Sequence, residues 1–184
     1  METRIPSKEE CLKILRKHQA PFDVIYHCLM VTEITERISS QIREINRELV
    51  IAGAMLHDIG RSKDHTIFHA IEGARIIERE KLDQRLVSIV RKHIGSGITE
   101  NEAEKLGLPL DDYIPRTIEE IVVSYSDNLT SDERECSFEE TLEDFCRKFG
   151  EDSHVVKGYI RQKEIIEGII SKNNLKEEIE KKTK

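Results

Sequence analysis

The segment Leu49–Leu56, which reads LVIAGAML, is apolar on every side and leads directly into His57 and Asp58. A helix without a polar face has to lie at the centre of a helical protein, where neighbouring elements cover it all round. Asn46 is placed to cap the start of this helix, and Gly60 is placed to end it. The sequence therefore predicts a buried central helix that carries a histidine and an aspartate into the core, where unpaired polar groups are unfavourable.

The rest of the chain repeats apolar positions every three or four residues, which is typical of amphipathic helices. Capping boxes, single capping residues and prolines mark the starts of six further helices, near Ser7, Pro21, Asp83, Thr99, Pro115 and Ser137. Two more helices are expected from about Thr66 to Glu80 and from about Glu151 to Asn174. No alternation strong enough for a sheet is present. The pattern predicts an all-α bundle of about six to nine helices.

Composition narrows the function classes. The net charge of −7 argues against general nucleic-acid binding, and the longest apolar run is far too short to cross a membrane. Four cysteines lie far apart without paired spacing, which favours free buried thiols and a cytoplasmic location. The chain becomes more polar after about Ser131. We therefore expect a domain over residues 1–130, with its core at 21–130, and a C-terminal helical extension with a frayed tail over 131–184.

Six histidine and aspartate side chains fall on apolar helix faces or at the ends of buried helices: His27, His57, Asp58, His69, His93 and Asp127. A single histidine in such a place is usually a core residue bonded to a backbone carbonyl. Six such groups together favour a metal site, because buried charges need partners and a cation is a strong one. Imidazole and carboxylate ligands suit Fe, Mn, Zn, Ni or Co.

The motif AGAMLHDIGRS, with a histidine about thirty residues before it and VVSYSDNLTS well after it, resembles the HD superfamily of metal-dependent phosphohydrolases. The likeness covers Pro21 to Thr130. The motifs HAIEGARII and VRKHIGSGIT extend it to a subgroup with two more histidines. HIGSGIT followed by AEKLGLP is similar to an uncharacterised, largely archaeal branch of HD hydrolases.

This resemblance implies roles for the six residues. One ion would be held by His27, His57, Asp58 and Asp127, and a second by His69 and His93 with Asp58 as the bridge. The site would then take one or two divalent transition-metal ions. A hydroxide activated between them would attack a phosphoester or phosphoanhydride, in a nucleotide or dinucleotide, so that Asp58 is also a catalytic residue. Two alternatives stay open: an HD-type di-iron oxygenase and a non-catalytic regulatory module.

Departures from known branches limit the substrate. The cyclic-dinucleotide phosphodiesterase branch has a second histidine after the one that matches His93, and a Gly-Tyr-Pro stretch follows. Here Ile94 and Gly95 stand in that place, so that substrate is set aside. The mononuclear deoxynucleotidase branch has a glutamate shortly after the His-Asp pair, where this chain has Arg61 and Lys63. The ligand pattern is most similar to HD hydrolases of symmetrical dinucleoside polyphosphates.

Other residues are candidates for binding a small phosphorylated substrate. Arg61 and Lys63 follow the His-Asp pair and are expected to be catalytic through contact with substrate phosphate. Further candidates for substrate contact are Arg75, His65, and Ser96 and Thr99 in the loop that contains Gly95 and Gly97. Surface positions are expected for His18 and His154, and the chain is compatible with a homo-oligomer.

Overall fold

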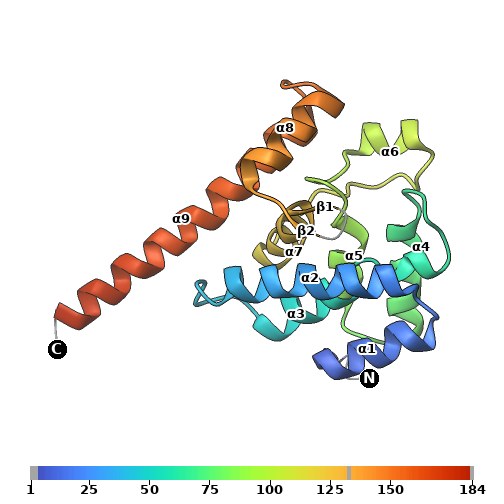
Figure 1. The fold of residues 1–184 in the computed structure, drawn as a ribbon, viewed down its shortest axis with the longest axis horizontal. Helices are drawn as coiled ribbons and strands as arrows, with labels where there is room; N and C mark the ends of the chain where they lie inside the picture. Colours follow the sequence, from blue (N-terminus) through green and yellow to red (C-terminus); the bar gives the residue numbers. More distant parts are fainter. Residues whose placement is uncertain (1–3, 132–133, 183–184) are drawn as a thin grey trace.

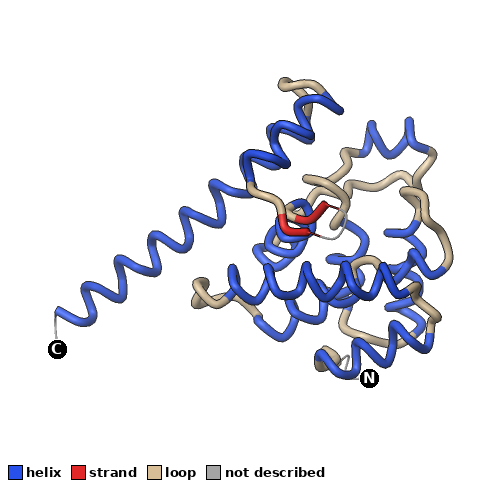
Figure 2. The backbone as a smooth tube through the Cα atoms, in the orientation of Figure 1, coloured by secondary structure: helices blue, strands red, loops and turns tan. Residues whose placement is uncertain are grey.

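The structure, a computed structural model, describes residues 4–131 and 134–182, with side chains as far as residue 176. Helices make up almost all of the regular structure, as Figures 1 and 2 show, and the predicted all-α class is confirmed. The helices are α1 Lys8–Lys17, α2 Phe22–Ser39, α3 Arg47–Leu56, α4 His69–Arg79, α5 Gln84–Lys92, α6 Glu100–Leu106, α7 Ile118–Asn128, α8 Phe138–Phe149 and α9 His154–Lys182. A 3₁₀ turn spans Ile59–Ser62, and two short strands are β1 Thr130–Ser131 and β2 Arg134–Glu135.

Helix α3 lies at the centre of the bundle, as its apolar sequence predicts. It packs against α1, α2, α5 and α7. The side chains of Val50, Met55 and Leu56 are completely buried. Asn46 caps the helix by accepting a hydrogen bond from the Leu49 amide at 3.0 Å. The end of this buried helix is therefore fixed inside the core, and His57 and Asp58 follow it there.

Most predicted helix starts are confirmed, but those of α4, α7 and α9 lie further along the chain. Capping boxes begin α1, α6 and α8 at Ser7, Thr99 and Ser137. Helix α7 begins at Ile118 rather than at Pro115, because Thr117 and Glu120 form a further capping box. Helix α4 begins at His69 rather than near Thr66. The predicted element is present in all three cases, and the start is shifted by three residues.

Gly60 has a different role from the one its position suggests. Helix α3 ends at Leu56, and Gly60 lies in the 3₁₀ turn that follows. A side chain at Gly60 would place its Cβ 1.8 Å from the His69 carbonyl oxygen and 2.5 Å from the Gly73 amide nitrogen. The two glycines thus let the turn and α4 touch through their backbones. A Cβ at Gly73 would likewise lie 2.7 Å from the Val90 side chain.

The C-terminal part adds a hairpin and two helices. The strands pair antiparallel, Thr130 with Glu135 and Ser131 with Arg134. This sheet was not predicted, since strands of two residues are too short to show an alternating pattern. Helices α8 and α9 pack on each other, and α9 also packs on α7. Figure 1 shows the far end of α9 projecting from the bundle. It begins at His154 rather than at Glu151, and its backbone is helical to Lys182, beyond the expected end near Asn174.

The domain boundary and the fraying of the tail stay predictions. The cysteines are free, as expected, and Cys11, Cys28 and Cys136 are buried. Within the described residues, no helix combines the length and the apolar character that crossing a bilayer requires.

Candidate metal centre

All six predicted histidines and aspartates converge where several helices end. His27 comes from α2, His57 follows the last residue of α3, and Asp58 precedes the 3₁₀ turn. His69 is the first residue of α4, His93 follows α5, and Asp127 lies in the last turn of α7. His57, Asp58, His69 and His93 are buried, whereas His27 and Asp127 are partly open to solvent.

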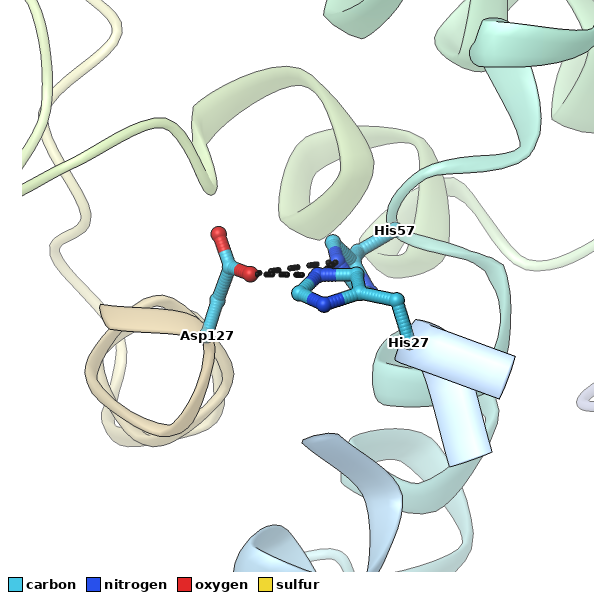
Figure 3. A group of neighbouring side chains, drawn as sticks. All are labelled: His27, His57 and Asp127. Carbon is cyan, nitrogen blue, oxygen red and sulfur yellow. Dashed lines mark hydrogen bonds and ion pairs between the residues drawn. The ribbon is translucent and has the colours of Figure 1, made fainter. Parts of the chain in front are cut away.

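His27, His57 and Asp127 form a first donor set, which Figure 3 shows. The Nε2 atoms of His27 and His57 are 3.2 Å apart. The Oδ1 atom of Asp127 lies 2.9 Å from the first nitrogen and 3.4 Å from the second. Two ring nitrogens and one carboxylate oxygen therefore point at a common position.

Asp58, His69 and His93 form a second donor set. Asp58 Oδ1 lies 3.1 Å from His69 Nε2 and 3.4 Å from His93 Nε2, and the two ring nitrogens are 3.1 Å apart. The other carboxylate oxygen, Oδ2, is 3.8 Å from the Nε2 atoms of both His27 and His57. Asp58 thus turns one oxygen toward each donor set.

The spacing within each set fits a coordinated transition metal. Metal–nitrogen and metal–oxygen bonds of about 2.0–2.1 Å give ligand–ligand distances of about 2.9 Å in an octahedron and about 3.4 Å in a tetrahedron. The separations in the first set run from 2.9 to 3.4 Å, and those in the second from 3.1 to 3.4 Å. Both sets thus have the dimensions of one face of a coordination polyhedron.

The histidine rings are held in the form that binds metals. The Nδ1 atoms of His57, His69 and His93 donate to backbone carbonyls at 2.8, 2.6 and 2.7 Å. A carbonyl can only accept, so Nδ1 carries a proton and each ring, when neutral, has its lone pair on Nε2, which faces the site. Lone pairs about 3 Å apart repel unless a cation lies between them, so this arrangement of Nε2 atoms favours a metal ion.

The carboxylates of the site are kept ionised. Burial alone would raise the pKa of Asp58, but the charge of His57 and the contacts with His69 and His93 lower it well below the usual value. Burial likewise opposes ionisation of Asp127, yet His57 and His27 hold its pKa far below the ordinary range. Asp58 Oδ1 is buried and has no hydrogen-bond partner among the described residues. Such an oxygen is suited to a metal ion, since a buried acceptor atom without a partner is unfavourable.

The pKa values of His93 and His57 are shifted in opposite directions. Burial lowers the pKa of His93, which keeps this ring neutral. Burial also acts to lower the pKa of His57, but Cys28, Asp127 and Asp58 together raise it well above the usual value. The negative charge of the site therefore attracts a positive one, and a divalent ion would supply it.

Arg61 lies beside the donors, as predicted. Its Nε donates to Asp58 Oδ2 at 2.6 Å. Its side chain lines two neighbouring cavities. One, of about 550 Å³, extends from His27 and Asp127 toward α8. The other, of about 380 Å³, contains Asp58 and the predicted candidate His65.

The remaining candidates lie elsewhere. The Lys63 side chain is exposed and does not line either cavity beside the donors. Arg75 is also exposed and forms an ion pair with Glu72 on α4. Ser96 donates to the Val155 carbonyl on α9 and lines a separate cavity, whereas Thr99 caps α6. His18 is half-buried and forms an ion pair with Glu80, and His154 is exposed.

Two residues at the site were not singled out from the sequence. Tyr26, which is 42% exposed, lines the smaller cavity. The Thr130 hydroxyl donates to the Asp127 carbonyl at 2.7 Å and lies 3.5 Å from His27 Nδ1. In the sequence they are marked only by position: Tyr26 adjoins the predicted ligand His27, and Thr130 lies three residues beyond the predicted ligand Asp127.

A family model for the HD domain matches residues 24–132, more than half of the chain. The chain therefore belongs to the HD family, and the predicted resemblance is confirmed.

The chain is also similar to other proteins in sequence and in fold. The chain is 44% identical over 144 residues to a tRNA (cytidine(56)-2'-O)-methyltransferase of Picrophilus torridus. The matched segment covers 78% of this chain and 42% of the relative. The chain is 38% identical to an uncharacterised protein of Methanocaldococcus jannaschii, over 83% of this chain and 92% of the relative. The chain thus spans less than half the length of the methyltransferase. The HD domain of the phosphodiesterase PgpH from L. monocytogenes, solved with cyclic-di-AMP, shares the fold: its TM-score is 0.54 at 20% identity, covering 88% of this chain and 95% of that one.

Proposed function

We propose that this chain is a metal-dependent phosphohydrolase that holds two divalent ions in donor sets joined by Asp58. The observation that carries the proposal is the position of this one carboxylate, whose two oxygens face separate groups of histidines. A carboxylate so placed can bind two cations at once. The donor types suit Fe, Mn, Zn, Ni or Co.

The residues have separate tasks. When bound, the divalent ions would supply Lewis acidity toward a phosphoryl oxygen and make a nearby water more acidic. The four histidines and Asp127 fix the positions of the ions. Arg61 holds Asp58 in place through Nε, and its terminal N–H groups remain available to bind a phosphate oxygen. Phosphoryl transfer depends mainly on positioning and charge, so no side-chain nucleophile is required.

The proposed substrate is a small phosphoester or phosphoanhydride of a nucleotide. In the smaller cavity, the exposed residue Tyr26 lies with His65 and Arg61 beside Asp58, and rings and a cation together suit a base and a phosphate. The larger cavity has as many acidic as basic residues: Asp127, Glu140, Glu143 and Asp144 against Arg61, Arg134, Arg147 and Lys148. This balance and the net charge of −7 disfavour a long polyanion.

Metal analysis followed by an activity screen tests the proposal. The purified protein should contain close to two transition-metal ions per chain. It should hydrolyse at least one member of a panel of nucleotides, dinucleoside polyphosphates and cyclic and linear dinucleotides. His69→Ala should remove about one ion, and His57→Ala should abolish turnover while the helical circular dichroism stays. His18→Ala serves as the control, because this histidine lies outside both donor sets.

Other outcomes would contradict the proposal in distinct ways. Oxygen consumption together with a redox-sensitive iron spectrum, without hydrolysis, would assign the chain to the oxygenase alternative. Bound metal without turnover on the whole panel would favour a regulatory module. An unchanged metal count in His69→Ala would leave a one-ion site.

A further inference from the structure

A separate cavity of about 380 Å³ lies where α9 passes the start of α7 and the loop after α5. It shares no lining residue with the two cavities beside the metal centre. The loop after α5 separates this cavity from the metal centre: His93 at its start belongs to the second donor set, whereas Ser96 lines the cavity. The volume is within the range of about 300–1,000 Å³ that small-molecule sites occupy.

The cavity is rimmed by basic residues in a chain that is acidic overall. His154, Lys157 and Arg161 lie on one face of α9, and Arg116 stands opposite, before α7. The described residues that line the cavity include no aspartate or glutamate. Lys157 forms an ion pair with the exposed Asp152 at 3.1 Å, and Arg116 pairs with Asp112. Arg161 makes no ion pair with the described part of the chain, so its guanidinium is available. This rim suits an anion, and several N–H donors in one place suit phosphate.

A buried amide adds a second, independent observation. Gln162 lines the cavity and is only 4% exposed. Its Nε2 donates to Ser124 Oγ at 2.9 Å, and this hydroxyl in turn donates to the Gly95 carbonyl at 2.6 Å. The amide is therefore fixed with Oε1 as a free acceptor, and this atom has no partner among the described residues. A buried acceptor without a partner is unfavourable, so a ligand that donates a hydrogen bond would stabilise it.

The walls between the rim and the amide are apolar. They consist of Ile114, Pro115, Ile121 and Ile165. Gly158 keeps α9 close to the loop, since a Cβ there would lie 2.4 Å from Ser96 Oγ. Basic residues, apolar lining residues and one buried acceptor together match a molecule with a charged end and an apolar end that carries N–H or O–H groups.

We propose that this cavity binds a nucleoside phosphate, with the phosphates at Lys157 and Arg161 and the nucleoside between the apolar walls, where it donates to Gln162. The site is distinct from the metal centre and does not depend on the proposed hydrolysis.

Calorimetric titration of the full, metal-loaded chain tests the proposal with two probes that resist phosphoanhydride hydrolysis. The probes are α,β-methylene-ADP and methylenediphosphonate, which has the same charged end without the nucleoside. The double variant Lys157→Ala/Arg161→Ala should weaken one binding event for α,β-methylene-ADP by about tenfold or more. Lys172→Ala is the matched control, an exposed cation on α9 outside the cavity, and should stay within twofold of the parent chain. Gln162→Met should weaken the nucleotide probe by about fivefold but leave methylenediphosphonate unchanged.

Two outcomes would overturn the proposal. One is equal binding of the nucleotide probe to the parent and the double variant. The other is an equal loss with Lys172→Ala, which would mean diffuse charge attraction. If Gln162→Met fails to fold, the surface variants still decide, because Lys157 and Arg161 are exposed. Loss of binding at the metal centre alone would count against the proposed hydrolysis and not against this cavity.

Discussion

Replacing Gly60 by alanine should disturb the second donor set without changing any ligand. The new Cβ would lie 1.8 Å from the His69 carbonyl oxygen, whereas real Cβ contacts essentially never fall under 3.0 Å. The 3₁₀ turn and the start of α4 must therefore separate by at least the difference between these two distances. Metal ligands tolerate displacements of only about 0.2 Å. Because the clash falls on a donor residue itself, we expect loss of about one ion per chain.

The same clash should also lower the stability and the turnover of the protein. Overpacking of this kind costs about 1–3 kcal/mol, and for a chain of this length each kcal/mol lowers the melting temperature by about 2–4 °C. A misplacement near 1 Å lowers turnover by about 100-fold. Gly168→Ala is the matched control: nothing lies within 4 Å of a Cβ at that helical position, and alanine should stabilise the chain by about 0.5–1 kcal/mol.

Thermal unfolding with a chelator present separates the packing cost from metal-linked stabilisation. Metal content and turnover are then measured on the loaded protein. A Gly60→Ala protein with the melting temperature, metal count and turnover of the parent chain would refute this prediction.

Three other variants test the site and its surroundings. Asp58→Asn should weaken metal binding by more than about 100-fold, since even the partners of metal ligands contribute about 10–100-fold; an unchanged metal count would contradict the bridging role. Arg61→Gln should keep the metal content and lower kcat/KM by about 10–100-fold, and loss of metal instead would show a structural role. Burial opposes ionisation of Glu120, but backbone N–H groups, Ser88 and Lys92 lower its pKa. Its contribution to stability is therefore complete above pH 4.5, the ordinary pKa of the carboxyl group, and is lost as pH falls through the depressed folded value. Glu120→Gln should be less stable by about 1–3 kcal/mol at neutral pH, and denaturant titrations should show this gap closing in acid.

The sequence predicted the elements and the six donors because both leave local signals. Helical periodicity places the helices, and the apolar surroundings of His57 and Asp58 mark the site. Contacts between distant segments leave no such signal. The sequence predicts only that Gly60 ends a helix. In the structure, the backbone of α4 lies so close to Gly60 that no Cβ fits there.

The cavity beside α9 also depends on contacts between distant segments, which the sequence does not reveal. Gln162 and Arg61 are both polar residues within or beside helical patterns, and periodicity alone does not separate them. Arg61 was predicted because it follows the His-Asp motif. Gln162 becomes a candidate binding residue only in the folded chain, where α9 packs against α7 and Ser124 fixes the Gln162 amide.

Helix ends explain why these donors can be assembled in a helical bundle at all. The last carbonyls of a helix lack partners within it, and His57 and His93 follow α3 and α5, where they donate to Ala54 and Val90. One hydrogen bond thus satisfies a helix end and turns a ring nitrogen toward the site. Asp127 adds the last turn of α7, so three helix C-termini, each with partial negative charge, lie beside the two donor sets. The fold therefore stabilises a cation through its backbone as well as through its side chains, and substitutions of single ligands should weaken metal binding without removing this attraction.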